Sequence, residues 1–374
     1  MDTSTDLFNY ALHPSDSDGG VPPTYRDLMS KLGQPAYRAE QLAQWLWVRG
    51  AESYDDMSNL PAALRRQLAE VAPLPPVEIQ EVQHSKDGTR KYLLRFADGV
   101  SVEAVGLPST GSTKDGDGAQ RLTVCISSQA GCAMACSFCA TGRGGFKRNL
   151  LAGEIAKQVQ LVGADFGQRV SNARVSTRVS NVVVMGQGEP FHNYDSVLAA
   201  LRIINAPESK GGMNVGARHI TLSTSGIIEG IKRFAEEPEQ FTLAVSLHSA
   251  VQTTRDKIMP GLRAQPLKEL NKALVEYFEK TGRRPSLEYT LIEGLNDSPF
   301  EAETLIAFAK ETRAHVNLIP LNTTEANSKL QASHQTEALD FARALLAERV
   351  SVTIRKRRGA DIDAACGQLS QRQG

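Results

Sequence analysis

The 374-residue sequence predicts an α/β protein built as a partial TIM-type barrel, with a small N-terminal helical accessory domain and a β-hairpin extension. Two observations lead to this fold class. From Leu122 onward, short apolar segments rich in β-formers alternate with longer segments of helical periodicity. Repeated βα units require a mainly parallel sheet with helices outside it and right-handed crossovers. About six such repeats favour a closed or partly open barrel, a (β/α)6 arrangement, over a flat doubly wound sheet.

The barrel is expected to occupy residues 121–358. Ligands of such folds bind beyond the carboxyl ends of the strands, so chemistry is expected at that edge. The strands are expected at 122–127, 181–185, 219–223, 241–247, 287–292, 316–320 and 350–355, and the helices at 152–163, 194–204, 227–235, 267–281, 299–311 and 336–349.

Two segments of different character precede the barrel. Residues 1–24 are polar, acidic and interrupted by proline and glycine, so we expect a disordered tail. Residues 25–75 are expected to form the helical accessory domain, because Leu42, Trp45 and Leu46 recur at helical spacing. Prolines at the end of this segment indicate a boundary.

Residues 76–120 are expected to form a β-hairpin followed by a flexible loop. Residues 89–96 and 100–105 are rich in β-formers and flank a turn of sequence Ala-Asp-Gly. Residues 108–120 consist mostly of Gly, Ser, Thr and Asp, which is typical of a loop.

Composition limits the location of the protein and its class. The charges of the 42 basic and 42 acidic side chains cancel, so the net charge does not indicate a nucleic-acid partner. The N-terminus lacks the apolar core of a signal peptide, and no later run is long enough to span a membrane. Five cysteines, an odd number, indicate a reducing compartment. We expect a monomeric cytoplasmic protein that does not bind membranes.

Three cysteines lie within eight residues, at Cys132, Cys136 and Cys139, in the spacing C-x3-C-x2-C. Thiolates are the natural ligands of iron–sulfur clusters, and four irons held by three cysteines leave one iron with an open position. A small molecule can chelate that iron. The sequence therefore predicts a [4Fe-4S] cluster and, as its ligand, S-adenosylmethionine (SAM), bound through its amino and carboxylate groups.

A structural zinc site, an electron-transfer cluster and disulfides fit these cysteines less well. Structural zinc normally takes four protein ligands, and a site with four thiolates would have to recruit distant Cys125 or Cys366. An electron-transfer ferredoxin would show C-x2-C-x2-C with a further cysteine. Structural disulfides do not suit a protein without an export signal.

Polar residues recur where successive predicted strands end. Any one of them has an ordinary explanation as a turn residue or a helix cap. That explanation does not account for the whole set, because all of these residues lie at the same edge of the predicted sheet. We therefore expect a common ligand pocket there. The groups are Gly188 with Glu189, Ser223 with Ser225, Ser246 with His248, Glu293, and Asn317 with Asn322.

The cysteine spacing after a first barrel strand, with a Gly-Glu-Pro turn at Gly188–Pro190 after the second, resembles the radical SAM superfamily. Further motifs resemble the RlmN-type enzymes, which are dual-specificity adenine C2 methyltransferases of 23S rRNA and tRNA. The resemblance runs from about residue 25 to residue 369. Its other motifs are Val124-Cys-Ile-Ser-Ser-Gln-Ala-Gly-Cys132, Thr221-Leu-Ser-Thr-Ser-Gly226, Ser246-Leu-His248, Asn317-Leu-Ile-Pro320 and Gly359-Ala-Asp-Ile-Asp-Ala-Ala-Cys-Gly-Gln-Leu369.

This resemblance implies catalytic roles for three residues outside the C-x3-C-x2-C motif. Cys366, in the C-terminal segment 359–374, is expected to be methylated first and to carry the methyl group to adenine C2. A covalent link between protein and RNA results, which splits one difficult step into easier ones. Cys125 is expected to resolve that link by forming a transient disulfide with Cys366. Glu103 is the expected base for the C2 proton.

The resemblance also implies the binding residues and partners. Residues 25–75 are expected to help grip RNA, and the basic runs Arg143/Lys147/Arg148 and 355–358 to neutralise phosphates. The expected partners are 23S rRNA, tRNA and a low-potential electron donor such as flavodoxin or ferredoxin. The SAM contacts carried over are Gly188, Glu189, Ser223, Ser246, Leu247, His248 and Asn317.

Two alternative functions remain open at this point. The related resistance enzyme methylates C8 of the same rRNA adenosine, and spacing alone does not fix which carbon is attacked. An RNA-binding protein with a structural zinc site is the alternative of a different class.

Overall fold

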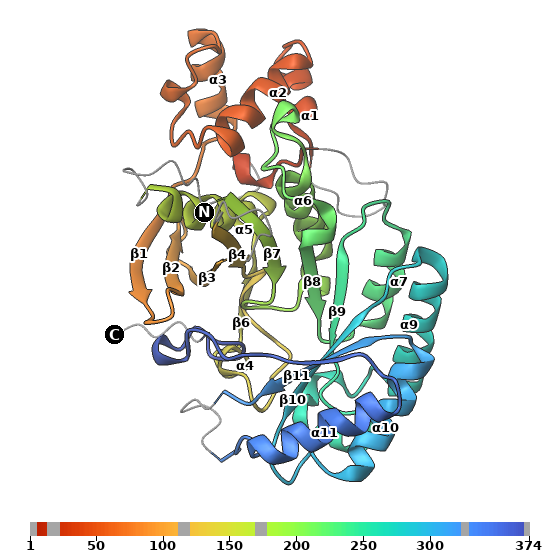
Figure 1. Ribbon diagram of the computed structural model, residues 1–374. Coiled ribbons are helices and arrows are strands. Elements are labelled where there is room, and N and C mark those ends of the chain that lie inside the picture. The colour runs from red at the N-terminus through yellow and green to blue at the C-terminus, as the bar shows by residue number, and fades with distance from the viewer. Residues whose placement is uncertain (1–5, 13–22, 111–119, 169–177, 323–328, 370–374) are drawn as a thin grey trace.

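The computed structural model describes residues 6–12, 23–110, 120–168, 178–322 and 329–369 (Figure 1). Its main sheet has the strand order β1-β2-β3-β4-β7-β8-β9-β10-β11-β12. From β4 to β12 every neighbouring pair is parallel. The two edge strands, β1 and β12, do not pair with each other in the described part of the chain, so the barrel is open. The predicted fold class is confirmed.

The parallel strands coincide with the predicted apolar segments. They are buried between the barrel interior and the outer helices, which is why they read as nearly continuous apolar runs. Their bounds are β4 (Gln120–Cys125), β7 (Arg178–Val184), β8 (Ile220–Thr224), β9 (Thr242–Ser246), β10 (Ser286–Leu291), β11 (His315–Pro320) and β12 (Val352–Ile354).

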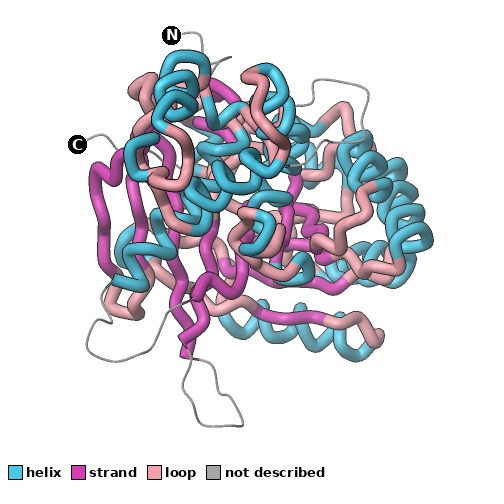
Figure 2. The backbone as a smooth tube through the Cα atoms, turned by 90° about the horizontal axis from the view of Figure 1, so that it is seen from above, coloured by secondary structure: helices cyan, strands magenta, loops and turns pink. Residues whose placement is uncertain are grey.

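The helices that connect these strands lie outside the sheet (Figure 2). Local signals fix some of their ends: Ser298 caps α10 with Pro299 at its first position, and Gly282 ends α9 in the left-handed conformation. The sequence did not predict the short helix α8 (Gln252–Ile258). The others are α5 (Ala152–Gln168), α6 (Tyr194–Asn205), α7 (Ile228–Glu236), α9 (Leu267–Thr281), α10 (Pro299–Glu311) and α11 (Gln335–Ala347).

Three antiparallel strands, β1 (Val77–His84), β2 (Arg90–Phe96) and β3 (Ser101–Thr110), extend the barrel sheet beyond β4. The hairpin prediction was therefore incomplete, since β1 was missed. The loop predicted at 108–120 was too wide, because β3 continues to Thr110 and β4 begins at Gln120. The remainder of that predicted loop lies outside the described residues.

The prediction of a disordered tail was wrong for residues 6–12. A 3₁₀ turn at Leu7–Asn9 buries Leu7 and Phe8 completely or nearly so. The Leu7 N–H donates to the Pro73 carbonyl at 3.0 Å, and a Cβ added to Gly153 of α5 would lie 2.5 Å from the Phe8 ring. Five apolar residues in a polar context anchor this segment. Residues 13–22 of the predicted tail lie outside the described residues.

The N-terminal helices sit above the barrel in Figure 1 and share one hydrophobic core with it. Trp47 is buried in that core and donates from its indole nitrogen to the Tyr25 hydroxyl at 3.2 Å. No helix among the described residues is long and apolar enough to cross a bilayer. The helices of this region are α1 (Tyr25–Lys31), α2 (Tyr37–Ala43), a π-helical turn (Gln44–Val48) and α3 (Ala62–Val71).

Candidate active site

The cysteine loop is held between two short strands, β5 (Gln129–Gly131) and β6 (Phe146–Asn149), and leads into the helical turn α4 (Ala140–Arg143). The Cys132 N–H donates to the Gly145 carbonyl at 2.9 Å. Gly131 has φ +77°, and a Cβ at this position would lie 1.9 Å from that carbonyl. Only glycine fits there, so the close approach of β5 and β6 fixes where the loop begins.

Cys132, Cys136 and Cys139 line one cavity of about 150 Å³. Burial raises the pKa of the Cys132 thiol to about 11 and that of Cys136 well above its usual range. Because their pKa values are raised, these groups stay protonated as thiols until a metal replaces their protons. Three thiols that line one cavity are one ligand fewer than a structural zinc site normally takes, and thiolates are the usual ligands of iron–sulfur clusters.

The Gly-Glu-Pro turn after β7 packs directly on the start of β5. Gly188 has φ +105°, and a Cβ would lie 2.6 Å from Gln129, so close packing demands glycine. The Glu189 carboxylate accepts hydrogen bonds from the Phe191 N–H, the Thr224 hydroxyl and the Ser225 N–H at 2.6–3.0 Å. Protein donors thus engage both Glu189 oxygens, and the side chain fastens this turn to the end of β8.

His248 follows β9 in the left-handed conformation, with φ 55°, and is 3% exposed. Its Nδ1 accepts a hydrogen bond from the Thr290 N–H at 2.9 Å, which places the ring proton on Nε2. Burial, with a smaller contribution from nearby Arg255, lowers the pKa of His248 to about 3. The ring is neutral and lies edge-on to Phe138 of the cysteine loop, at 4.6 Å between centroids.

Five of the seven residues predicted to bind SAM line the cavity that holds the three cysteines: Gly188, Glu189, Ser223, Ser246 and His248. The other two do not line it. Leu247 is fully buried in the hydrophobic core, and the Asn317 amide donates to Glu288 Oε1 at 2.8 Å.

Sequence reasoning missed two buried charged residues here. Glu288 on β10 lines the cavity and is 4% exposed. Arg255 on α8 is fully buried and donates to the Ser225 and Leu247 carbonyls. Burial lowers the pKa of Arg255 to about 10, and its charge lowers the pKa of Cys136. The available signal for Glu288 was a single charged residue inside a strand that has no other.

Cys366 lies where two cavities adjoin. It lines the cysteine cavity and a second cavity of about 180 Å³, which Cys125 and Met185 also line. Cys125 is buried on β4, and burial raises its pKa to about 12. The Cys366 side chain is accessible from the cavity, while the surrounding protein raises the pKa of its thiol. All five cysteines are free thiols, so the predicted Cys125–Cys366 disulfide is not formed in this structure.

The C-terminal segment is tied at two points to α4, directly after the cysteine loop, and at a third point to the residues after β11. The Ala140 N–H donates to the Gly367 carbonyl at 2.8 Å, and the Thr141 hydroxyl to the Leu369 carbonyl at 2.7 Å. The Asn322 amide donates to the Cys366 carbonyl at 3.1 Å. These contacts hold Cys366 beside the cysteine loop.

Glu103 does not line either of these cavities. It is buried on β3 and pairs with Lys91 at 3.2 Å, and both line a separate hollow with residues 361–363. The register pairs Val105 with Cys125, so Glu103, two residues away, shares the sheet face of Cys125. The structure thus brings Cys125, Cys366 and the cysteine loop together and leaves Glu103 on the other side of the C-terminal segment.

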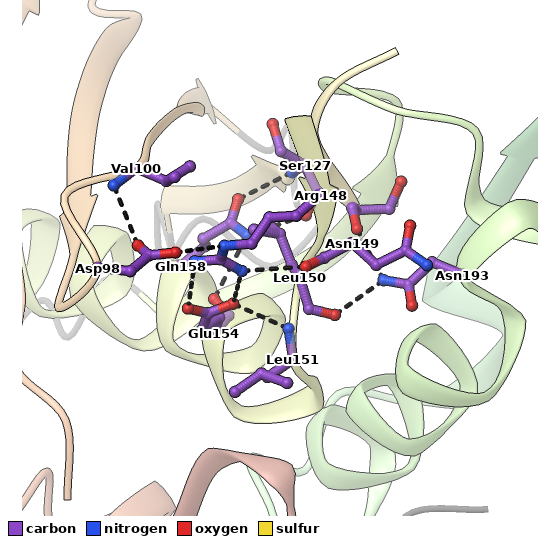
Figure 3. A network of polar contacts seen from close by, with 11 residues as sticks. Asp98, Val100, Ser127, Arg148, Asn149, Leu150, Leu151, Glu154, Gln158 and Asn193 are labelled. Atoms are coloured by element: carbon purple, nitrogen blue, oxygen red, sulfur yellow. Dashed lines mark hydrogen bonds and ion pairs between the residues drawn. The ribbon is translucent and has the colours of Figure 1, made fainter. Parts of the chain in front are cut away.

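Arg148 was predicted to neutralise RNA phosphates, but carboxylates of the protein hold its guanidinium. Figure 3 shows Arg148 inside a polar network that joins the β2–β3 turn, β6 and α5. Its Nε donates to Asp98 at 2.6 Å, and its two terminal nitrogens donate to the Glu154 carboxylate at 2.7 and 2.8 Å. The guanidinium also lies over the Phe96 ring. Asp98 is distant in sequence, so no local pattern revealed the pairing.

The basic run at 355–358 is only partly committed to the protein. Arg355 pairs with Glu288 at 3.4 Å and Arg358 with Asp87 at 3.6 Å. Arg357 donates to the Leu321 carbonyl at 2.8 Å. Lys356 and Arg357 are both exposed, and both line the second cavity beside Cys366. The two exposed side chains are placed to meet a polyanion approaching that cavity.

The sequence and the fold of the chain match those of known proteins. Residues 126–303 match the model of the radical SAM superfamily, and residues 23–74 match the ribosomal RNA large subunit methyltransferase N-terminal domain. A crystal structure of a radical SAM methyltransferase from Sphaerobacter thermophilus aligns with a TM-score of 0.83 at 39% identity, covering 98% of this chain and 99% of the other.

Two curated relatives are similar over most of their length. A probable dual-specificity RNA methyltransferase RlmN from Symbiobacterium thermophilum is 44% identical over 347 residues, covering 92% of this chain and 88% of the relative. One of the same description from Synechococcus elongatus is 45% identical over 353 residues, covering 93% and 91%. A [4Fe-4S] cluster and SAM are the cofactors of such enzymes, and the cysteine cavity fits them. The chain belongs to the RlmN family of radical SAM RNA methyltransferases.

Proposed function

We propose that the chain methylates C2 of a specific adenosine in 23S rRNA and of the adenosine 3′ to the anticodon in a subset of tRNAs. The observation that carries this proposal is the position of Cys366, which lines both the cysteine cavity and the neighbouring cavity. A residue at that junction can receive a methyl group on one side and deliver it to a base on the other. The target adenine must leave its stack to enter.

Cys132, Cys136 and Cys139 would hold the [4Fe-4S] cluster, with SAM between it and the ends of β7 to β9. When bound, the cluster supplies the electron for reductive cleavage of SAM. The protein supplies position and excludes water: Gly188 allows the close turn, and the neutral His248 ring packs on Phe138. One SAM would provide the methyl group and a second the radical chemistry.

Cys366 would carry the methyl group as a thioether, lose one hydrogen atom of that group to the SAM-derived radical, and bond to C2 through the resulting carbon. Cys125, as a thiolate, would then attack the Cys366 sulfur, forming an S–S bond as the C–S bond breaks, and the methylated base would leave with the electron pair of that bond and take up a proton. The cavity that Cys125 and Cys366 share supports this pairing. Glu103 would accept the C2 proton. Its position on the same sheet face as Cys125 supports this role.

RNA would approach the exposed Lys356 and Arg357 at the mouth of the second cavity, with residues 25–75 as an accessory grip. The free thiols and the RNA substrates support a cytoplasmic location. A flavodoxin or ferredoxin would serve as electron donor, and the chain would act as a monomer.

The test is an anaerobic assay with the reconstituted protein, SAM, a reductant and unmodified rRNA and tRNA fragments. Digested RNA is compared by mass spectrometry with synthetic 2-methyladenosine and 8-methyladenosine. The proposal predicts 2-methyladenosine from both RNAs. Formation of 8-methyladenosine would assign the chain to C8 chemistry, and an unmethylated RNA would refute the proposal.

A further inference from the structure

Three polar side chains stand side by side across the barrel strands. The parallel register pairs Ser246 of β9 with Glu288 of β10, and Glu288 with Asn317 of β11. Residues in register on neighbouring strands point to the same face of the sheet. Ser246 and Asn317 were predicted to bind SAM, and Glu288 lies directly between them.

The alternation along β10 places Glu288 on the inner face. Leu287 and Tyr289 pack in the hydrophobic core on the helix side, whereas Glu288 and Thr290 line the cysteine cavity. Glu288 is only 4% exposed. A carboxylate in such a position is costly unless each of its oxygens finds a donor.

The two oxygens of Glu288 differ in their partners. Oε1 accepts from the Asn317 amide at 2.8 Å and from Arg355 at 3.4 Å, with the Ser286 hydroxyl at 3.3 Å. Oε2 is buried and has no hydrogen-bond partner among the described residues. Arg355 and Asn317 therefore hold the carboxylate in one orientation and leave Oε2 as an acceptor on a cavity-lining side chain.

A carboxylate only accepts hydrogen bonds, so the ligand must bring a donor. SAM has donors in three places: its amino group, its ribose hydroxyls and its adenine amino group. In the proposed SAM site the amino group would bind the open iron of the cluster, which leaves the ribose hydroxyls and the adenine amino group. Acidic side chains bind ribose hydroxyls in other nucleotide sites because both hydroxyls can donate to them.

We propose that Glu288 accepts a hydrogen bond through Oε2 from a ribose hydroxyl of bound SAM. This inference rests on the proposed SAM site. It assigns Glu288 as a SAM-binding residue and Arg355 and Asn317 as the residues that position it.

The test measures binding to the reconstituted full-length protein by anaerobic equilibrium dialysis. The probes are SAM and its 2′-deoxy and 3′-deoxy analogues. A hydrogen bond to a charged group is worth about tenfold or more in affinity. The protein without substitutions should bind one analogue or both at least about tenfold more weakly than SAM. Glu288→Ala should bind SAM and that analogue equally.

Two further variants control for structural damage. Glu288→Gln keeps the side-chain volume, but its amide oxygen stays with the Asn317 amide and Arg355, which only donate, so its NH2 group takes the place of Oε2. Because that group cannot accept a hydrogen bond, this variant should weaken the preference as Glu288→Ala does. Glu301→Gln changes a carboxylate that is as buried as Glu288 and is held by Ser249 and Tyr289 outside the cavity. It should keep the full preference for SAM. The ratio of affinities does not depend on the fraction of folded protein.

An undiminished preference in Glu288→Ala would overturn this inference while leaving the SAM site intact. Equal binding of SAM and both analogues by the original protein would overturn it as well. No SAM binding by the original protein would instead refute the proposed SAM site, and the inference with it.

Discussion

The backbone N–H of Ala140 donates to the carbonyl of Gly367 at 2.8 Å. Ala140 directly follows the last cysteine of the loop, and Gly367 directly follows Cys366. Residues more than 200 positions apart in the sequence are thereby joined at the centre of the site. This contact links the cysteine loop, which is proposed to hold the cluster, to the Cys366 segment, which is proposed to carry the methyl group. A change in the position of one segment is therefore expected to move the other.

Replacing Cys366 with Ala should abolish methyl transfer and leave cluster assembly unchanged, because the backbone contacts of Gly367 and Leu369 do not involve the thiol. Iron and sulfide analysis measures the cluster, and mass spectrometry measures methylation. Cys366→Ser is the matched control for side-chain size and should be equally inactive. Turnover by either variant would refute the carrier role.

Replacing Cys125 with Ala should leave the protein covalently attached to its RNA, because the thiol proposed to release Cys366 is gone. Denaturing gels of anaerobic reactions with labelled RNA would show a species of low mobility. That species should be missing in the Cys125→Ala/Cys366→Ala double variant. If the single variant forms no cross-linked RNA, Cys125 does not resolve the adduct.

Gly188→Ala should destabilise the protein by about 1–3 kcal/mol through overpacking, with a further cost for its positive φ, because the new Cβ would meet Gln129 and Ser128. Urea unfolding measures the free energy of unfolding. Gly282→Ala is the matched control: its φ is also positive, but nothing lies within 4 Å of the added Cβ. Equal losses for the two variants would contradict the packing argument.

Arg148→Gln should destabilise the protein by about 3 kcal/mol, since it leaves the buried Glu154 carboxylate without its cation. RNA affinity of the folded variant should not change. Lys356→Gln should behave in the opposite way, with unchanged stability and a salt dependence of RNA binding reduced by about one phosphate contact. Urea unfolding and RNA titrations at several salt concentrations distinguish the two.

The buried His248 makes stability depend on pH. Its folded pKa of about 3 lies below the unfolded value of about 6.5, so between these values the unfolded chain binds the extra proton. As the pH falls below about 6.5, His248 therefore lowers the free energy of unfolding by on the order of 1 kcal/mol per pH unit. His248→Asn, which tolerates the left-handed backbone, should weaken this dependence. An identical slope in the variant, measured by urea unfolding from pH 5 to 7, would contradict the assignment.

Much of the barrel could be predicted because its strands are buried on both faces and its helices carry one apolar face. The strand β1 could not, since its side chains are largely exposed and read as polar. Residues 6–12 were missed because their apolar cluster is short and finds its partners only in the folded chain. The cysteine spacing pointed directly to three side chains that line one cavity, whereas the roles of Glu288 and Arg148 depend on partners far away in the sequence.

The central claim is that SAM binds at an incompletely ligated iron held by Cys132, Cys136 and Cys139. Electron paramagnetic resonance of the anaerobically reconstituted, reduced protein tests it most directly. The account predicts a [4Fe-4S]⁺ signal that changes when SAM is added and is lost in Cys136→Ala. A protein without this signal, or a signal that SAM leaves unchanged, would contradict the account.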